Sequence, residues 1–225
     1  MAKYAVLFDI DGTLLSTGGA GGRAMHAALK QGFDRVVGGE DVAYAGRCDK
    51  AIFAELLQVA KIEHNEQNIY TLTSIYLELL QHELNSHDAE LLPGVRELLE
   101  HFDAREDVAL GLLTGNLKRG ADLKLKHFGI HDYFLFGGFG DNHACRNALA
   151  SSMLSDIKTM AGVENPDNIW IIGDTPADVA CAKAINANCV AVATGLYKYH
   201  ELVSTGAEFV LNDLTESVTW HKDLN

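Results

Sequence analysis

Short, unbroken runs of apolar residues alternate with helical patterns along most of this 225-residue chain. These runs have the length of β-strands, and they lie at Lys3–Ile10, Val108–Leu113, Asn168–Ile172, Cys189–Ala193 and, more weakly, Glu208–Leu211. Strands that are buried on both faces are apolar throughout, whereas half-exposed strands alternate with polar residues. The alternation of such strands with helices predicts an α/β fold built on a doubly wound parallel sheet.

The helical patterns between these runs have recognisable ends. They cover Val95–Phe102, Leu117–Phe128, Ala148–Met160 and Pro176–Ile185. Gly129 and Gly162 follow the second and third pattern, and Pro176 begins the fourth, as the conformational preferences of glycine and proline favour. In open parallel sheets, ligands bind at the carboxyl ends of the strands. We therefore expect the functional residues in the turns that follow the apolar runs.

The stretch from residue 16 to residue 88 interrupts the alternation. It contains helical patterns at Ala51–Ala60 and Ile69–Leu84 and no convincing strand. A glycine cluster at Gly18–Gly22 opens the stretch; because no Gly-Lys-Ser/Thr sequence follows, we interpret it as a hinge and not as a nucleotide-binding loop. The sequence thus predicts a core of residues 1–15 and 89–225, with a helical cap of residues 16–88 inserted after the first strand.

Charge and composition exclude several classes of partner. Lys and Arg number 18 against 31 Asp and Glu, which gives a net charge of −13. Such an acidic surface repels nucleic-acid backbones and anionic lipids, and no apolar run approaches the roughly 18–20 residues of a membrane span. The four cysteines form no CxxC pair, and we interpret them as reduced thiols. We expect a soluble cytoplasmic protein that binds neither nucleic acid nor membrane; its oligomeric state stays open.

Polar residues follow three of the apolar runs. The sequence Asp-Ile-Asp-Gly-Thr at residues 9–13 follows the first, Thr-Gly-Asn at 114–116 the second, and Gly-Asp-Thr-Pro-Ala-Asp at 173–178 the third. Parallel strands end at the same edge of a sheet, so we expect the three motifs to form one site. Asp9, Asp11 and Asp174 would then form a cluster of hard oxygen ligands suited to Mg²⁺.

Each motif also has a purely structural interpretation. Asp and Gly are common in turns, Thr114 alone is typical of a turn or a helix cap, and Thr175 with Pro176 fits the start of a helix. None of these explains why Asp174 lies at the mouth of the sheet. The occurrence of polar motifs at three strand ends favours a functional site.

The motifs, in this order, resemble those of the haloacid dehalogenase-like hydrolases, specifically the phosphoglycolate phosphatase-like branch with a helical cap. The resemblance rests on FDIDGT, the helical insert, LLTGN and IIGDTPADV, and it covers nearly the whole chain. It implies a Rossmann-like core and a Mg²⁺-dependent phosphatase. The substrate would be a small phosphorylated metabolite, phosphoglycolate-like or a sugar phosphate, hydrolysed through an aspartyl-phosphate intermediate.

The resemblance also implies roles for the carboxylates. Asp9 would be the nucleophile, and Asp11 the general acid for the leaving alkoxide and then the base that activates water. Mg²⁺ would be held by the carboxylate of Asp9, the backbone carbonyl of Asp11 and the carboxylate of Asp174. Asp178 would support the metal site through water or by orienting a neighbour.

The phosphate-binding residues follow the pattern of the family with one departure. The Thr114 hydroxyl and the backbone N–H groups of Gly115 and Asn116 would bind phosphoryl oxygens. The family places a lysine before the last motif, but here the only strong cation of residues 137–147 is Arg146, and Lys158 lies deeper in a helical pattern. We assign the role of the lysine to Arg146, whose guanidinium can clamp a phosphate. The alternative is a surface arginine at a helix start.

The cap contains one further candidate, and two other functions stay open. Arg47, in the sequence Ala-Gly-Arg-Cys-Asp at residues 45–49, resembles the substrate-facing loop of related caps. It would meet a second anionic group of the substrate, or else be a solvated residue at a helix start. A phosphomutase of the same superfamily and a catalytically idle binding scaffold are the alternative functions. Only the missing lysine favours the scaffold.

Overall fold

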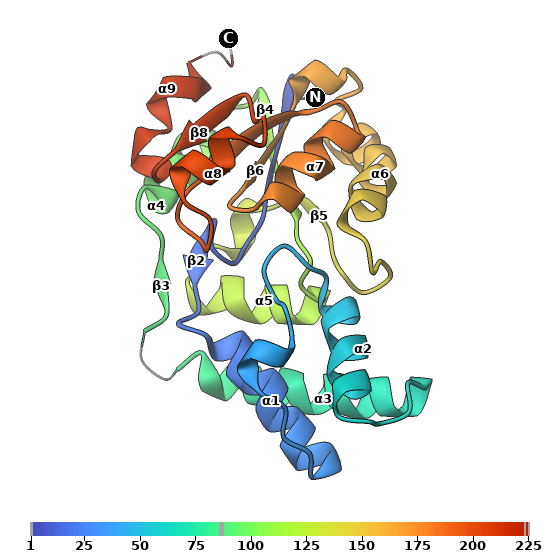
Figure 1. Cartoon of the computed structure of the whole chain (residues 1–225). Coiled ribbons are helices and arrows are strands. Elements are labelled where there is room, and N and C mark those ends of the chain that lie inside the picture. Colours follow the sequence, from blue (N-terminus) through green and yellow to red (C-terminus); the bar gives the residue numbers. More distant parts are fainter. Residues whose placement is uncertain (1, 86–87, 223, 225) are drawn as a thin grey trace.

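The computed structural model describes residues 2–85, 88–222 and 224. Within these residues six parallel strands form one sheet in the order β5-β4-β1-β6-β7-β8. Figure 1 shows helices packed around this sheet. The strands are β1 Tyr4–Phe8, β4 Val108–Leu113, β5 Phe136–Gly138, β6 Ile169–Gly173, β7 Asn188–Val192 and β8 Phe209–Leu211. The central strand β1 pairs with β4 on one side and with β6 on the other. The predicted α/β fold with a doubly wound parallel sheet is confirmed.

Strand β1 is buried because both faces of the sheet are covered. Tyr4, Val6 and Phe8 contribute to one hydrophobic cluster, together with residues of helix α4 (Val95–Asp103). Ala5 and Leu7 point to the opposite face and join a second cluster with residues of helices α6 (Arg146–Asp156) and α7 (Pro176–Ala184). Successive side chains of a strand alternate between its two faces, so a strand between two layers must be apolar at every position.

The helices of the core are α4 Val95–Asp103, α5 Lys118–His127, α6 Arg146–Asp156, α7 Pro176–Ala184, α8 Tyr199–Val203 and α9 Val218–His221. Helix α6 begins two residues before the predicted pattern and continues as a π-helical turn at Ile157–Ala161. Short 3₁₀ turns lie at Gly39–Asp41, His131–Tyr133, Pro166–Asn168 and Leu214–Glu216. No helix of the described part of the chain has both the length and the apolar character needed to cross a membrane.

Among the described residues, three helices lie in the predicted cap segment: α1 Ala20–Phe33, α2 Asp49–Val59 and α3 Glu66–Glu83. They share a hydrophobic cluster of their own and lie together, across α5 from the sheet, in Figure 1. A short antiparallel ribbon of β2 (Leu15–Ser16) and β3 (Glu90–Leu91) connects the cap to the core. The predicted domain boundaries at residues 16 and 88 lie beside this ribbon and stay a prediction.

The glycine cluster differs from the hinge that we expected. Gly18 and Gly19 have positive φ angles of 56° and 82°, but Gly21 and Gly22 lie inside helix α1. The glycines obscured the start of this helix in the sequence, because glycine is a poor helix former. The hinge interpretation is therefore wrong for Gly21 and Gly22.

Replacing Gly94 with alanine is expected to lower the free energy of unfolding by about 2–4 kcal/mol. Gly94 precedes α4 with a φ of +79°, and an added Cβ would lie 2.3 Å from the carbonyl carbon of Leu214. Gly129→Ala is the matched control, because Gly129 also has a positive φ, +65°, but faces open space. It should cost only the backbone strain, about 1–2 kcal/mol. Urea denaturation measures both; equal losses would contradict the steric argument.

Candidate active site

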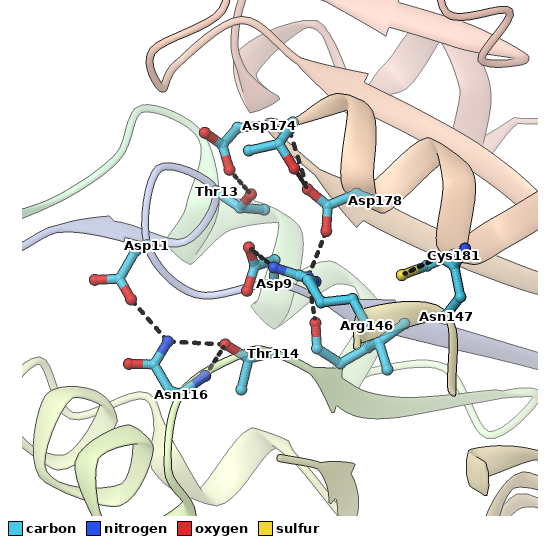
Figure 2. A network of polar contacts seen from close by, with 12 residues as sticks. Asp9, Asp11, Thr13, Thr114, Asn116, Arg146, Asn147, Asp174, Asp178 and Cys181 are labelled. Atoms are coloured by element: carbon cyan, nitrogen blue, oxygen red, sulfur yellow. Dashed lines mark hydrogen bonds and ion pairs between the residues drawn. The ribbon is translucent and has the colours of Figure 1, made fainter. Parts of the chain in front are cut away.

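The carboxyl ends of β1, β4 and β6 meet at one edge of the sheet. A cavity of about 410 Å³ lies there, between the sheet and the cap. Its walls include Asp9, Asp11, Asn116, Arg146 and Asp174, which come from all three strand-end motifs and from the start of α6. Figure 2 shows most of these side chains converging from separate elements. Because β1 lies between β4 and β6, residues distant in the sequence become neighbours.

Arg146 joins two carboxylates at the base of this cavity (Figure 2). Its Nη1 donates to Oδ2 of Asp9 at 3.1 Å, and its Nη2 donates to Oδ1 of Asp178 at 2.5 Å and to the carbonyl oxygen of Leu113 at 3.1 Å. The residue is only 6% exposed. Burial would lower the pKa of Arg146, but the charges of Asp178 and Asp9 raise it well above its ordinary value. The alternative interpretation of Arg146 as a surface arginine at a helix start is therefore wrong.

Asp174 lies on the other side of the acidic cluster and has few partners. The Thr13 hydroxyl donates to its Oδ1 at 3.3 Å. Burial, together with the negative charges of Asp178 and Asp9, raises the pKa of Asp174 to about 8. Gly12 and Gly195 pack against the carboxylate so closely that an added Cβ would lie 2.5 Å and 1.7 Å, respectively, from its Oδ2. Gly195 was not among the site residues predicted from the sequence.

The carboxylates of Asp9, Asp174 and Asp178 suit a divalent cation. One oxygen of each lies within 4.8 Å of the others, and all three residues are buried. Three buried acidic groups against the single guanidinium of Arg146 leave an uncompensated negative charge, which a hard cation such as Mg²⁺ would neutralise. The residues present therefore fit the expected metal.

Asp178 contributes differently from the other two. Its Oδ2 accepts hydrogen bonds from the backbone N–H of Thr175 at 3.0 Å and from the Thr175 hydroxyl at 2.7 Å, and its Oδ1 accepts from Arg146. Thr175 is the N-cap of α7 and Pro176 its first residue, as expected. With both oxygens engaged, Asp178 anchors the helix start and orients Arg146, while Asp9 and Asp174 are freer to meet a cation.

Asp11 is held on the side of the cavity that faces the cap. Lys124 donates from Nζ to its Oδ1 and Oδ2 at 2.8 and 2.6 Å, and Nδ2 of Asn116 donates to Oδ2 at 2.7 Å. Lys124 Nζ also donates to Oδ1 of Asn116 at 2.5 Å. Lys124 was not among the site residues predicted from the sequence. Its spacing in the sequence could have indicated burial, because Lys124 lies on the same face of α5 as Gly120, Ala121 and Leu125.

The loop after β4 lies under the cap. Thr114 is fully buried, accepts hydrogen bonds from the backbone and side chain of Asn116, and does not border the cavity. Gly115 and Asn116 do border it. Gly115 touches the cap loop so closely that an added Cβ would lie 2.1 Å from the carbonyl oxygen of Arg47. The backbone N–H of Asp49 donates to the carbonyl oxygen of Gly115 at 2.8 Å.

Arg47 borders the cavity from the cap. Its Nη1 donates to the carbonyl oxygen of Ala43 at 2.8 Å and forms an ion pair with Glu55. The guanidinium is therefore neutralised within the cap itself.

Comparison with known proteins identifies the class. Residues 6–192 match the model of the haloacid dehalogenase-like hydrolase family, so the chain belongs to this family. Phosphoglycolate phosphatase 1 of Pseudomonas aeruginosa is 26% identical over 94% of this chain and 77% of its own length. The phosphoglycolate phosphatase of Chromobacterium violaceum is 30% identical over 55% of this chain, and the match spans about half of that protein (53%). The family and these relatives indicate an enzyme of the phosphatase class.

Solved structures share the fold. The crystal structure of CbbY from Rhodobacter sphaeroides in complex with phosphate has a TM-score of 0.76 at 21% identity and covers 96% of both chains. A protein from Thermotoga maritima provisionally named a β-phosphoglucomutase has a TM-score of 0.65 at 19% identity, over 99% of this chain and 100% of its own. At these identities the structural similarity establishes the fold alone. Proteins named as phosphatases and a protein named as a mutase both share this fold.

Proposed function

We propose that the protein is a Mg²⁺-dependent phosphatase that hydrolyses a small phosphorylated metabolite through an aspartyl-phosphate intermediate. The observation that supports this proposal most is that the carboxylates at the strand ends lie in two separate environments. Asp9 and Asp174 lie together at the base of the cavity with Arg146, whereas Asp11 is held separately by Lys124 and Asn116. Nucleophile and acid–base group therefore have different environments, as two-step phosphoryl transfer requires.

In the first step, a carboxylate oxygen of Asp9 attacks phosphorus, the bond from phosphorus to the ester oxygen breaks, and Asp11 donates a proton to the leaving alkoxide. In the second step, Asp11 takes a proton from water, the water oxygen attacks phosphorus, and the bond to Asp9 breaks to release inorganic phosphate. Bound by Asp9, the Asp11 carbonyl and Asp174, Mg²⁺ would offset the repulsion between the anionic nucleophile and the anionic phosphoryl group. Asp178 supports this arrangement by orienting Arg146.

Arg146 takes the place of the lysine that the family pattern leads one to expect. Its guanidinium is already next to Asp9, so it is positioned to stabilise negative charge where the phosphoryl group binds. Gly115 and Asn116 would present backbone N–H groups to phosphoryl oxygens. The Thr114 hydroxyl, which does not border the cavity, would act only by orienting the side chain of Asn116. Arg47 would form part of the substrate wall on the cap.

The substrate is proposed to be small because the cavity measures about 410 Å³. Phosphoglycolate is named for the P. aeruginosa and C. violaceum relatives, and a phosphoglycolate-like compound or a sugar phosphate is the corresponding proposal here. The four cysteines are free thiols, three of them buried, which supports a reducing, cytoplasmic location.

A phosphomutase is the second candidate, because a mutase name occurs among the structures with the same fold. A mutase would return the phosphoryl group to a sugar instead of releasing it to water. Quantifying inorganic phosphate against the isomerised sugar phosphate separates the two. An idle scaffold has less support, since Asp9, Asp11 and Asp174 are all retained and border the cavity.

Removing divalent cations should abolish activity on a generic aryl phosphate. We expect phosphate release in the presence of Mg²⁺, a loss of about 100-fold or more in EDTA, and recovery when Mg²⁺ is added in excess. The reason is that the anionic nucleophile and the anionic ester otherwise repel one another. Equal rates with Mg²⁺ and with EDTA would contradict the metal requirement.

A further inference from the structure

The end of the cavity that faces the cap has its own set of polar residues. Tyr76 of α3, Asp49 at the start of α2 and Lys124 of α5 all border it. A Cβ added at Gly120 would lie 3.6 Å from the Tyr76 hydroxyl oxygen, and the charge of Lys124 acts on Asp49. Two elements of the cap and one of the core thus meet beyond the point where the phosphoryl group would bind.

The hydroxyl of Tyr76 lacks a hydrogen-bond partner among the described residues. The side chain is fully buried, and its oxygen exposes almost no surface. A buried polar group without a partner is costly, by about 1–3 kcal/mol, and such groups are rare in folded proteins. Tyr76 lines the cavity, so a molecule that fills the cavity is a candidate for the missing partner once its hydroxyl is uncovered.

Asp49 offers an acceptor at the same end. Its Oδ2 accepts a hydrogen bond from the backbone N–H of Leu117 at 2.9 Å, while its Oδ1 has no hydrogen bond within the described part of the chain. Burial raises the pKa of Asp49 to about 6, against the lowering effect of Lys124. Near neutral pH the Asp49 carboxyl group is therefore mainly ionised, and its Oδ1 can accept a hydrogen bond from a ligand.

Each described cation on the cavity wall is already paired with a carboxylate. Arg146 is bound to Asp9 and Asp178, Lys124 to Asp11, and Arg47 to Glu55. A second anionic group on the substrate would thus meet no unpaired cation at the cap-facing end. It would instead lie near the negative charge of Asp49, an arrangement that costs binding free energy.

We propose that the cap-facing end binds a leaving group that carries hydroxyl groups and no second charge, with Asp49 and Tyr76 as its hydrogen-bond partners. One substrate hydroxyl would donate a hydrogen bond to Oδ1 of Asp49, and a substrate oxygen would accept a hydrogen bond from the Tyr76 hydroxyl. The preferred substrates are then phosphomonoesters of polyols or sugars, in preference to phosphorylated carboxylic acids. This inference rests on the proposed phosphatase function and narrows its substrate class.

A pair of esters that differ in one group tests the preference. Glycerol 3-phosphate and 3-phosphoglycerate have the same carbon skeleton, with a terminal hydroxymethyl group in one and a carboxylate in the other. We expect kcat/KM to be at least about tenfold higher for glycerol 3-phosphate, which corresponds to about 1.4 kcal/mol. Equal values, or a preference for 3-phosphoglycerate, would overturn the inference.

Two variants connect the preference to the residues. Asp49→Asn keeps an oxygen that accepts from Leu117 but removes the negative charge, so it should reduce the preference between the two esters by about tenfold. Tyr76→Phe should raise KM for glycerol 3-phosphate about three- to tenfold by removing one hydrogen bond. Tyr70→Phe is the matched control, because Tyr70 lies on the same helix and is 69% exposed. If Tyr76→Phe behaves like Tyr70→Phe, the hydroxyl has no part in binding.

Equilibrium binding separates this inference from the proposed function. Calorimetric titration of Asp9→Asn with each ester in Mg²⁺ requires no turnover. Tighter binding of glycerol 3-phosphate supports the substrate class even if the wild-type protein hydrolyses no ester, in which case only the phosphatase proposal fails. Tighter binding of 3-phosphoglycerate, or binding of neither ester, overturns the substrate class even if an aryl phosphate is hydrolysed.

Discussion

Asp9→Asn is expected to lower kcat by at least about 10⁴-fold, a loss typical of removing a nucleophile. A carboxamide carries no negative charge and is a poor nucleophile towards phosphorus. The substitution keeps the shape of the side chain, and Arg146 retains its bond to Asp178. The fold should therefore persist, which far-ultraviolet circular dichroism would verify alongside steady-state kinetics on an aryl phosphate.

A control and a direct trap strengthen this test. Asp103→Asn makes the same chemical change at an exposed position at the end of α4, and it should leave the rate unchanged. Rapid acid quenching of the wild-type reaction, followed by peptide mass analysis, should place a phosphoryl group on the peptide that contains Asp9. Retention of activity by Asp9→Asn would overturn the assignment of the nucleophile.

Arg146→Ala is expected to lower kcat/KM by about 10²–10³-fold, as loss of a charge-stabilising donor in an active site usually does. The guanidinium lies against Asp9 and is 6% exposed, so water cannot readily replace it. Arg146→Lys should restore part of the rate, because an ammonium keeps the charge but cannot reach Asp9, Asp178 and the carbonyl of Leu113 with a planar fork.

A purely structural role for Arg146 predicts a different result. Removing the cation leaves Asp9 and Asp178 buried without it, which should cost about 3–5 kcal/mol of stability in the absence of metal. Mg²⁺ binding should recover some of this stability, and thermal unfolding with and without Mg²⁺ measures it. Arg35→Ala, at an exposed position after α1, is the control. If Arg146→Ala has a stability deficit that Mg²⁺ corrects but a normal rate, Arg146 has no part in the chemistry.

The parallel sheet could be predicted because its strands are buried on both faces. Continuous apolar runs predicted β1, β4, β6 and β7, and each predicted strand end lies within two residues of the observed end. The edge strand β5 was missed because two of its three residues are glycines, which carry no hydrophobic pattern. Helix α1 was missed for a similar reason, since two glycines lie in its first turn.

Part of the candidate site could also be predicted, because it consists of local motifs at strand ends. The proximity of Asp9, Asp11 and Asp174 could be predicted because parallel strands end at the same edge of a sheet. Lys124 could not be placed in the same way. Its contact with Asp11 joins residues 113 positions apart, and one lysine among several in a helix shows no local sign of its partner.

The sequence by itself determined the fold class, the family and the carboxylates at the strand ends, because apolar periodicity and strand-end motifs are properties of neighbouring residues. Only the tertiary structure decided which cations meet which carboxylates. It paired Arg146 with Asp9 and Lys124 with Asp11, and it brought Tyr76 of the cap to the same cavity. Charge pairing in a buried site depends on distances of a few ångströms between elements far apart in the chain, and those distances arise only when the whole chain has folded.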